Sequence, residues 1–146
     1  ASTPWKIASF RIETFAKKYL AARFDWSTES AGSRKDVLKN LVSEKVLQSL
    51  KSPLEADESL AKTQNAQSYF LLEERGLSYS NTKRIIEAKI TRVVRVRNAA
   101  VATPMVVRLS FQEASINSAN PYGLIVDGLE ELDPEAAQLG ADQEAK

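Results

Sequence analysis

Residues 105–112 read MVVRLSFQ, and this stretch decides the fold class. Its side chains alternate between apolar (Met105, Val107, Leu109, Phe111) and polar (Arg108, Ser110, Gln112). Because successive residues of a strand point to opposite faces of a sheet, the alternation predicts a half-buried strand. Residues 83–97 show the same period of two, and residues 122–129 are a further predicted strand. A predicted turn at 98–103 and a polar loop at 115–119 separate these runs, so we expect antiparallel pairing.

The residues before these strands follow a helical period instead. Residues 3–23 form one predicted helix, with Thr3 as its cap and Pro4 at the first helical position. Its expected buried stripe contains Trp5, Ala8, Phe10, Ile12, Phe15, Ala16, Tyr19 and Leu20. A capping box from Ser33 to Asp36 predicts a second helix that runs to about Ser49.

Two segments complete the predicted layout. Pro53 is expected to end the second helix, and residues 54–64 are a candidate for a short third helix. Residues 66–79 fit either a helix end or a first strand. Helices followed by antiparallel strands predict an α+β domain with the helices on one face of the sheet. We expect one domain over residues 1–132 and a flexible tail over 133–146, which is rich in Ala, Gln and acids.

Composition excludes several kinds of chemistry. The chain has no cysteine and no histidine, so thiolate nucleophiles, Ser–His triads and the usual zinc sites are ruled out. We therefore predict no catalytic residues, no metal and no cofactor. Twenty basic and 19 acidic residues give a net charge of +1, which argues against bulk electrostatic binding to nucleic acid. No apolar run approaches the roughly 20 residues of a membrane span.

The most distinctive short motif is Asn120-Pro121-Tyr122-Gly123. Asn120 can hydrogen-bond the backbone of a turn, Pro121 fixes its own backbone angle, and Gly123 tolerates conformations that other residues do not. One interpretation is a purely structural turn that fixes the entry into the last strand. The other is a rigid corner from which Tyr122 projects to set an interface.

The order of elements, with Asn-Pro-x-Gly opening the final strand, resembles the VirB-eight-like family and its TrbF-type relatives. The resemblance covers Trp5 to about Leu132 and is carried mainly by Asn120 to Gly123, continuing into Leu124 to Gly128. These are inner-membrane assembly proteins of type IV secretion and conjugation systems. The resemblance implies a cup like that of nuclear transport factor 2, in which a curved, mainly four-stranded antiparallel sheet cradles the helices.

The resemblance also implies a function and a location. We expect an extracytoplasmic domain, periplasmic or at the cell surface, behind a membrane anchor that lies outside these residues. It would self-associate and contact other secretion-channel proteins. The alternative is a small-ligand-binding protein or isomerase-like enzyme on the same scaffold, which would need an inward-facing acid or base.

Charged residues on the predicted strands raise further hypotheses. Arg92 falls on the apolar face with Ile90 and Val94, so it needs a partner, a bulge or a cleft, where it could meet a carboxylate of another protein. The strand region is locally basic, with Lys83, Arg84, Lys89, Arg92, Arg95, Arg97 and Arg108. The favoured interpretation is a solvated sheet face, and the alternative is docking onto an acidic protein surface or transient contact with nucleic acid. The acid pairs 73–74 and 130–131 are expected to be solvated, and Trp5 and Trp26 are expected to be core and lid residues and not stacking platforms.

Overall fold

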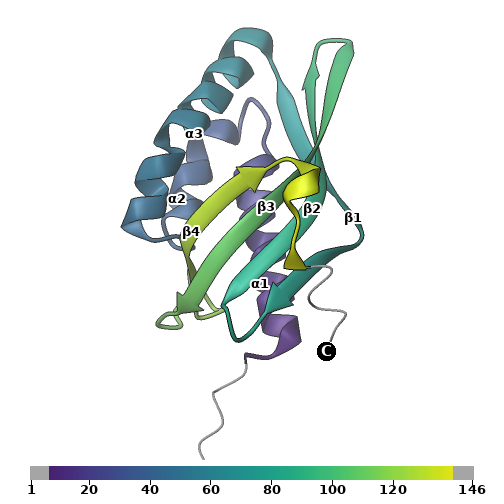
Figure 1. Ribbon diagram of the computed structural model, residues 1–146. Helices are drawn as coiled ribbons and strands as arrows, with labels where there is room; N and C mark the ends of the chain where they lie inside the picture. Colours follow the sequence, from purple (N-terminus) through teal and green to yellow (C-terminus); the bar gives the residue numbers. More distant parts are fainter. Residues whose placement is uncertain (1–6, 140–146) are drawn as a thin grey trace, which may run out of the picture.

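The computed structural model describes residues 7–139, in which helices precede a four-stranded antiparallel sheet (Figure 1). The helical elements are α1 (Ser9–Phe24), the 3-10 turn η1 (Ala31–Ser33), α2 (Arg34–Leu38) and α3 (Glu44–Gln64). The strands, in sheet order, are β1 (Gln67–Ser80), β2 (Ile85–Val96), β3 (Ala99–Glu113) and β4 (Leu124–Leu132), and a 3-10 turn η2 (Pro134–Ala136) follows. The predicted α+β class and antiparallel pairing are confirmed. Among the helices of this range, none is long and apolar enough to cross a bilayer.

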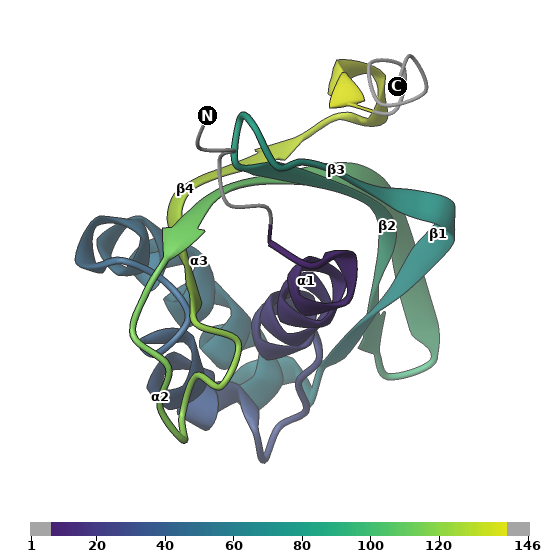
Figure 2. The ribbon, with the colours of Figure 1, turned by 90° about the horizontal axis from the view of Figure 1, so that it is seen from below.

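The sheet curves around α1, with α2 and α3 on the same side, so the expected cup is confirmed (Figure 2). The core lies between the helices and the concave face of the sheet. Its largest fully buried side chains include Ile12, Phe15, Tyr19 and Leu20 from α1 and Ile86, Ile90 and Leu109 from the strands. Burying each apolar side chain of this size contributes about 1.5–3 kcal/mol.

Helix α1 begins at Ser9, six residues later than its predicted start, and no side chain caps it. Thr3, Pro4 and Trp5 lie outside the described residues. Phe10 was expected on the buried stripe, but it is 79% exposed. It precedes the buried Ile12 by two positions, or about 200° around the helix axis, so it belongs to the opposite face.

The predicted second helix is interrupted, because α2 ends at Leu38 and α3 begins at Glu44. Residues between them pair with the edge of β4: the Val126 amide donates to Leu41 O, and the Ser43 amide donates to Val126 O, each at 2.8 Å. This tertiary pairing overrides the helical pattern of the sequence. The cap of α3 is Ser43, whose hydroxyl accepts from the Val46 amide.

Two expectations about helix ends were wrong. The Ser33 side chain caps no helix; its hydroxyl donates to Ser30 O instead. Pro53 does not end a helix but lies inside α3. Leu50 and Leu54 on either side of it are almost fully buried, so packing holds both halves of α3 against the core although Pro53 lacks a backbone donor.

Residues 66–79, ambiguous in sequence, belong almost entirely to β1, which carries a register shift between Leu72 and Leu77. The turn predicted at 98–103 is much shorter, because residues 99–103 pair with β2. The final strand starts at Leu124, two residues later than predicted. After β4, residues 134–139 lie on the convex face of the sheet (Figure 2). The division into a domain over 1–132 and a tail over 133–146 stays a prediction.

Candidate functional site

The Asn120–Gly123 turn joins the β3–β4 connection to the first residue of β4. Asn120 is 3% exposed, and its amide nitrogen donates to Asn40 O at 2.9 Å and to Leu124 O at 2.7 Å. Asn40 belongs to the segment between α2 and α3. One side chain therefore ties that segment to the start of β4, which is the entry-fixing role expected of the motif.

Gly123 is required by both its backbone angle and its surroundings. Its φ is +63°, a region that favours glycine. A Cβ placed there would lie 2.6 Å from Arg11 Nη2 and 2.7 Å from Ile116 Cγ1. Arg11 approaches this closely because it donates to the carbonyl oxygens of Tyr122 and Gly123. The turn is thus also attached to α1.

The aromatic ring of Tyr122 is half-buried and packs on Phe15 of α1, with ring centroids 6.0 Å apart and planes inclined by 60°. Two exposed apolar residues belong to the segments that meet at this corner, the β3–β4 connection and the first turn of α1. Ile116 is 68% exposed and lies beside Gly123, and Phe10, which is 79% exposed, directly precedes Arg11. We call Phe10, Ile116, Pro121 and Tyr122 the corner patch.

Arg92 has a partner within the chain. Its Nη2 donates to Asp57 Oδ1 at 2.9 Å, and its guanidinium lies 5.4 Å from the centroid of the Phe24 ring. A charge on the apolar face needed a partner, a bulge or a cleft, and the structure provides a partner, Asp57. Contact between Arg92 and another protein stays a prediction.

Asp57 is the centre of an ion cluster that the sequence analysis missed. Its Oδ2 accepts from Arg23 Nη1 at 2.9 Å and from Arg34 Nη1 at 3.0 Å. Arg23 also pairs with Glu131 of β4 at 3.1 Å. The cluster therefore connects all three helices with β2 and β4. Helical spacing could have revealed it, because Asp57 continues the buried stripe of Leu50 and Leu54, and Arg23 follows the buried Tyr19 by four positions.

The electrostatics of this cluster favour permanent charges. Burial by itself raises the pKa of Asp57, but Arg92, Arg23 and Arg34 outweigh it, so the pKa lies below its ordinary value. Burial works against charge on Arg23 too, yet Glu131 and Asp57 raise its pKa overall. Burial lowers the pKa of Arg34. A carboxylate held in this way stays ionised near neutral pH, so the cluster fits a structural role better than acid–base work.

Other charged residues of the predicted basic region are divided between the two faces of the sheet. Arg108 pairs with Glu87 at 2.8 Å and with Glu130 at 3.1 Å on the convex face, whereas Arg92 pairs on the concave face. Glu130 and Glu131 are exposed, as expected, and both are also ion-paired with arginines. Trp26 is 4% exposed in a small second core, as expected.

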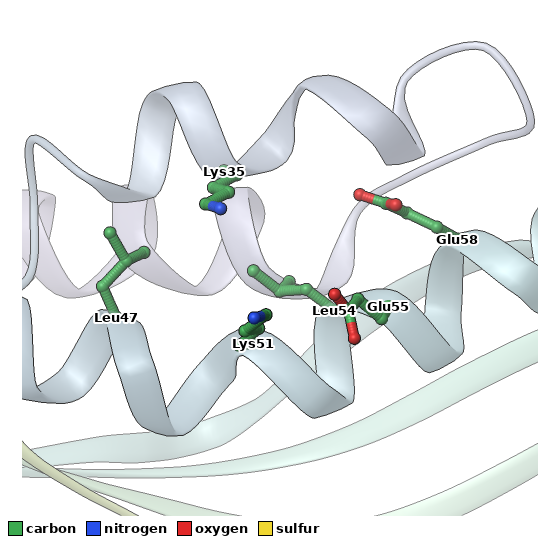
Figure 3. Close-up of a pocket in the computed structure, with 6 residues that line it drawn as sticks. All are labelled: Lys35, Leu47, Lys51, Leu54, Glu55 and Glu58. Atoms are coloured by element: carbon green, nitrogen blue, oxygen red, sulfur yellow. The ribbon is translucent and has the colours of Figure 1, made fainter.

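The hollow drawn in Figure 3 lies between α2 and α3 and has a volume of about 110 Å³. Lys35 reaches it from α2, and Leu47, Lys51, Leu54, Glu55 and Glu58 reach it from α3. Pockets for small ligands usually measure about 300–1,000 Å³, so this hollow is too small to be one. Within residues 7–139, no cluster of three acidic side chains is placed to hold a metal ion.

Solved structures of type IV secretion proteins share this fold. VirB8 of Agrobacterium tumefaciens superposes with a TM-score of 0.74 and 12% identity, covering 94% of this chain and 100% of that one. The TrwG component of the type IV secretion system of Bartonella birtlesii gives 0.71 and 16%, covering 90% and 95%. The TraE protein in complex with 2-(2-furyl)isonicotinic acid gives 0.72 and 13%, covering 90% and 99%.

No protein-family model matches the sequence, and no curated protein matches it either. The likeness is therefore one of structure at low identity, and it extends over nearly the whole described chain. The resemblance inferred from the Asn-Pro-x-Gly motif and the order of elements is confirmed at the level of the fold. The chain has the fold of the VirB8-like proteins of type IV secretion systems.

Proposed function

We propose that this chain is a non-catalytic assembly component of a type IV secretion or conjugative DNA-transfer machine, and that it provides protein–protein contacts in the inner-membrane complex. The observation that supports this most is the extent of the structural match. All of the A. tumefaciens VirB8 structure and 94% of this chain superpose. The likeness thus involves a complete domain and not a shared supersecondary motif.

The chemistry of the cup supports a structural role over the enzymatic alternative. Helix α1 lies within the curve of the sheet (Figure 2), where an enzyme on this scaffold would need its substrate. The acids Asp57 and Glu131 near the concave face are paired with arginines. A small-ligand role, which the isonicotinic acid complex of TraE illustrates for that protein, would need a larger pocket than the hollow of about 110 Å³ between α2 and α3.

Location and partners follow from the same proposal. The domain would lie on the extracytoplasmic side of the inner membrane, held by an anchor outside these residues, and would form homo-oligomers and contact other channel proteins. Nucleic-acid contact is less favoured, because Arg84, Arg92 and Arg108 are each paired with a carboxylate of the chain. The corner patch is the surface that we assign to self-association.

Surface variants test this assignment without disturbing the core. Phe10→Glu and Ile116→Glu place a charge on the corner patch. Val101→Glu is the control, because it places the same charge on an exposed apolar residue (63%) of the β2–β3 hairpin. Sedimentation over a range of concentrations measures self-association, and complementation of a deletion strain measures DNA transfer or secretion. We expect the two corner variants to weaken self-association by about tenfold or more, and Val101→Glu to behave as wild type.

Two outcomes would contradict the proposal. Full transfer or secretion in the strain that lacks the gene would show that this protein is not a required component of the machine. Equal self-association for Phe10→Glu, Ile116→Glu and Val101→Glu would place the contact elsewhere on the surface. Thermal melting checks that each variant is folded before either measurement is interpreted.

A further inference from the structure

The C-terminal strap, residues 134–139, docks on the convex face of the sheet, opposite the helices (Figure 2). It is fastened through its backbone. The amides of Gln138 and Leu139 both donate to the same oxygen, Glu87 Oε1, at 2.8 and 2.7 Å. Glu87 lies on β2, an inner strand of the sheet, and is only 2% exposed.

Arg108 completes the polar part of this contact. Its Nε donates to the other oxygen of Glu87 at 2.8 Å, and its Nη2 donates to the carbonyl oxygen of Ala136 at 2.7 Å. The carboxylate and the guanidinium therefore bind, respectively, backbone donors and a backbone acceptor of one short segment. Burial by itself raises the pKa of Glu87, but the hydrogen bonds from Leu139, Gln138 and Arg108 outweigh it and hold the pKa below its ordinary value.

The apolar part of the contact lies beside these charges. Val106 pairs with Lys89, one register step of two residues from the Glu87–Arg108 pair, so its side chain is on the convex face. Although this face points away from the helices, Val106 is fully buried, and Leu139 of the strap is 5% exposed. The strap packs against β3 through η2, and it adds the buried aliphatic side chain of Leu139 to the face on which Val106 lies.

We propose that Glu87, Arg108 and Val106 form a peptide-binding socket, that the strap is its removable occupant, and that the strap of a second copy of this chain can replace it. The socket offers a buried carboxylate to two consecutive amides, a guanidinium to a carbonyl oxygen and an apolar surface to a leucine. Any peptide with this backbone conformation and this leucine could therefore bind there. The segment whose fit the structure demonstrates is the strap itself, and each further copy brings an identical one.

Exchange of straps between two copies needs no new contacts. Each socket would receive the partner's strap through the same contacts, which gives a closed two-fold arrangement. The strap joins β4 through Asp133 alone, so it competes in its own socket at an effective concentration on the order of millimolar. Exchange should therefore become prominent when the chain's own strap is weakened or when the domain is concentrated at an assembly site.

Hydrogen exchange on the wild-type chain tests whether the strap is removable. The amides of Gln138 and Leu139 bind Glu87, so their protection reports docking directly. We expect them to exchange at least about 100-fold faster than the β3 amide of Val107, because strap opening does not require the sheet to unfold. Exchange of all three amides at one common rate would show that the strap is an integral part of the domain and would overturn the proposal.

Peptide binding tests the socket. A fluorescent peptide of residues 133–139 is titrated into the full chain carrying Leu139→Asp, which weakens its own strap, and into wild type. We expect saturable binding to the variant, at least about tenfold weaker binding to wild type, and loss of binding to a Glu87→Ala, Leu139→Asp double variant. A peptide with Asp in place of its leucine is the matched control and should not bind.

Three results would refute the socket. These are absence of peptide binding to a folded Leu139→Asp chain, equal binding with and without Glu87, and unfolding of the domain by Leu139→Asp, since a removable strap is not needed for folding. The assay contains no secretion protein and leaves the corner patch unchanged. Its failure is therefore separate from failure of the proposed function.

Discussion

Asp57 of α3 and Arg92 of β2 form a 2.9 Å ion pair between the helical layer and the sheet, 35 positions apart in the chain. The same carboxylate accepts from Arg23 and Arg34, so α1, α2, α3 and β2 converge on one side chain. In the strand pattern Arg92 is a charge on the apolar face. In the folded chain it is a contact that fixes the position of the helices relative to the sheet.

Asp57→Asn should destabilise the domain severely. Removing the carboxylate takes away the ion-pair partner of Arg34, which is 4% exposed, and leaves the equally buried Arg23 paired with Glu131 alone. Breaking a buried ion pair in this way typically costs about 3–5 kcal/mol, and we expect a loss of that size in the free energy of unfolding, measured with urea. Glu55→Gln, at an exposed acid of the same helix, should change it by less than about 0.5 kcal/mol. Similar shifts for both variants would show that the cluster adds little.

Between pH 2.5 and 8, stability should fall only at the acid end. The pKa values of Asp57 and Glu87 are lower in the folded chain than in the unfolded one. The stability they contribute is therefore complete above the ordinary pKa, about 4, and is lost as the pH falls through the lower, folded values. Urea midpoints from pH 2.5 to 8 should be constant above about pH 5.5 and decline below about pH 4. A main decline between pH 5 and 7 would assign the pH dependence to other groups.

The parts of the fold that could be predicted depend on local periods. The alternation in residues 105–112 identifies β3, and helical spacing identifies α1, because each pattern reflects one buried face. The break between α2 and α3 has no such local signal, since Leu41 and Ser43 leave the helix to pair with Val126, more than 80 positions away. Pairing partners chosen by the tertiary fold override propensity there.

The candidate sites show the same limit. The motif at residues 120–123 was recognisable as a turn because Pro and Gly restrict the backbone locally. Its attachment to Asn40 and Arg11 required the folded chain. For Arg92 the position was predictable and the partner was not, although Asp57 could have been noticed as an acid on the buried stripe of α3.

Ser43→Ala should lower the free energy of unfolding by about 0.5–2 kcal/mol, the usual cost of losing an N-cap. The Ser43 hydroxyl accepts from the Val46 amide at the start of α3, and that amide has no partner within the helix. Ser33→Ala is the matched control, because the Ser33 hydroxyl caps no helix and its loss should cost less than about 0.5 kcal/mol. Chemical denaturation of both variants decides between the observed cap and the capping box expected from the sequence. The reverse order of effects would contradict the cap at Ser43.

Asn120→Ala separates the structural role of the turn from its role in self-association. The variant removes the donor to Asn40 O and Leu124 O, and we expect a loss of about 1–3 kcal/mol, the cost of leaving buried polar groups unpaired. Asn40→Ala is the control: it removes a surface hydrogen bond to Asp36 O but keeps the carbonyl that Asn120 uses, so its effect should be less than about 1 kcal/mol.

The decisive measurement for the turn is made where Asn120→Ala remains folded, for example at low temperature without denaturant. Asn120 is buried, so it cannot touch a partner directly and can act only by orienting Pro121 and Tyr122 in the corner patch. If that orientation matters, sedimentation of the folded variant shows weaker self-association than wild type. If the folded variant associates as wild type does, the motif serves stability alone, and any contact made through Phe10 and Ile116 does not depend on the turn.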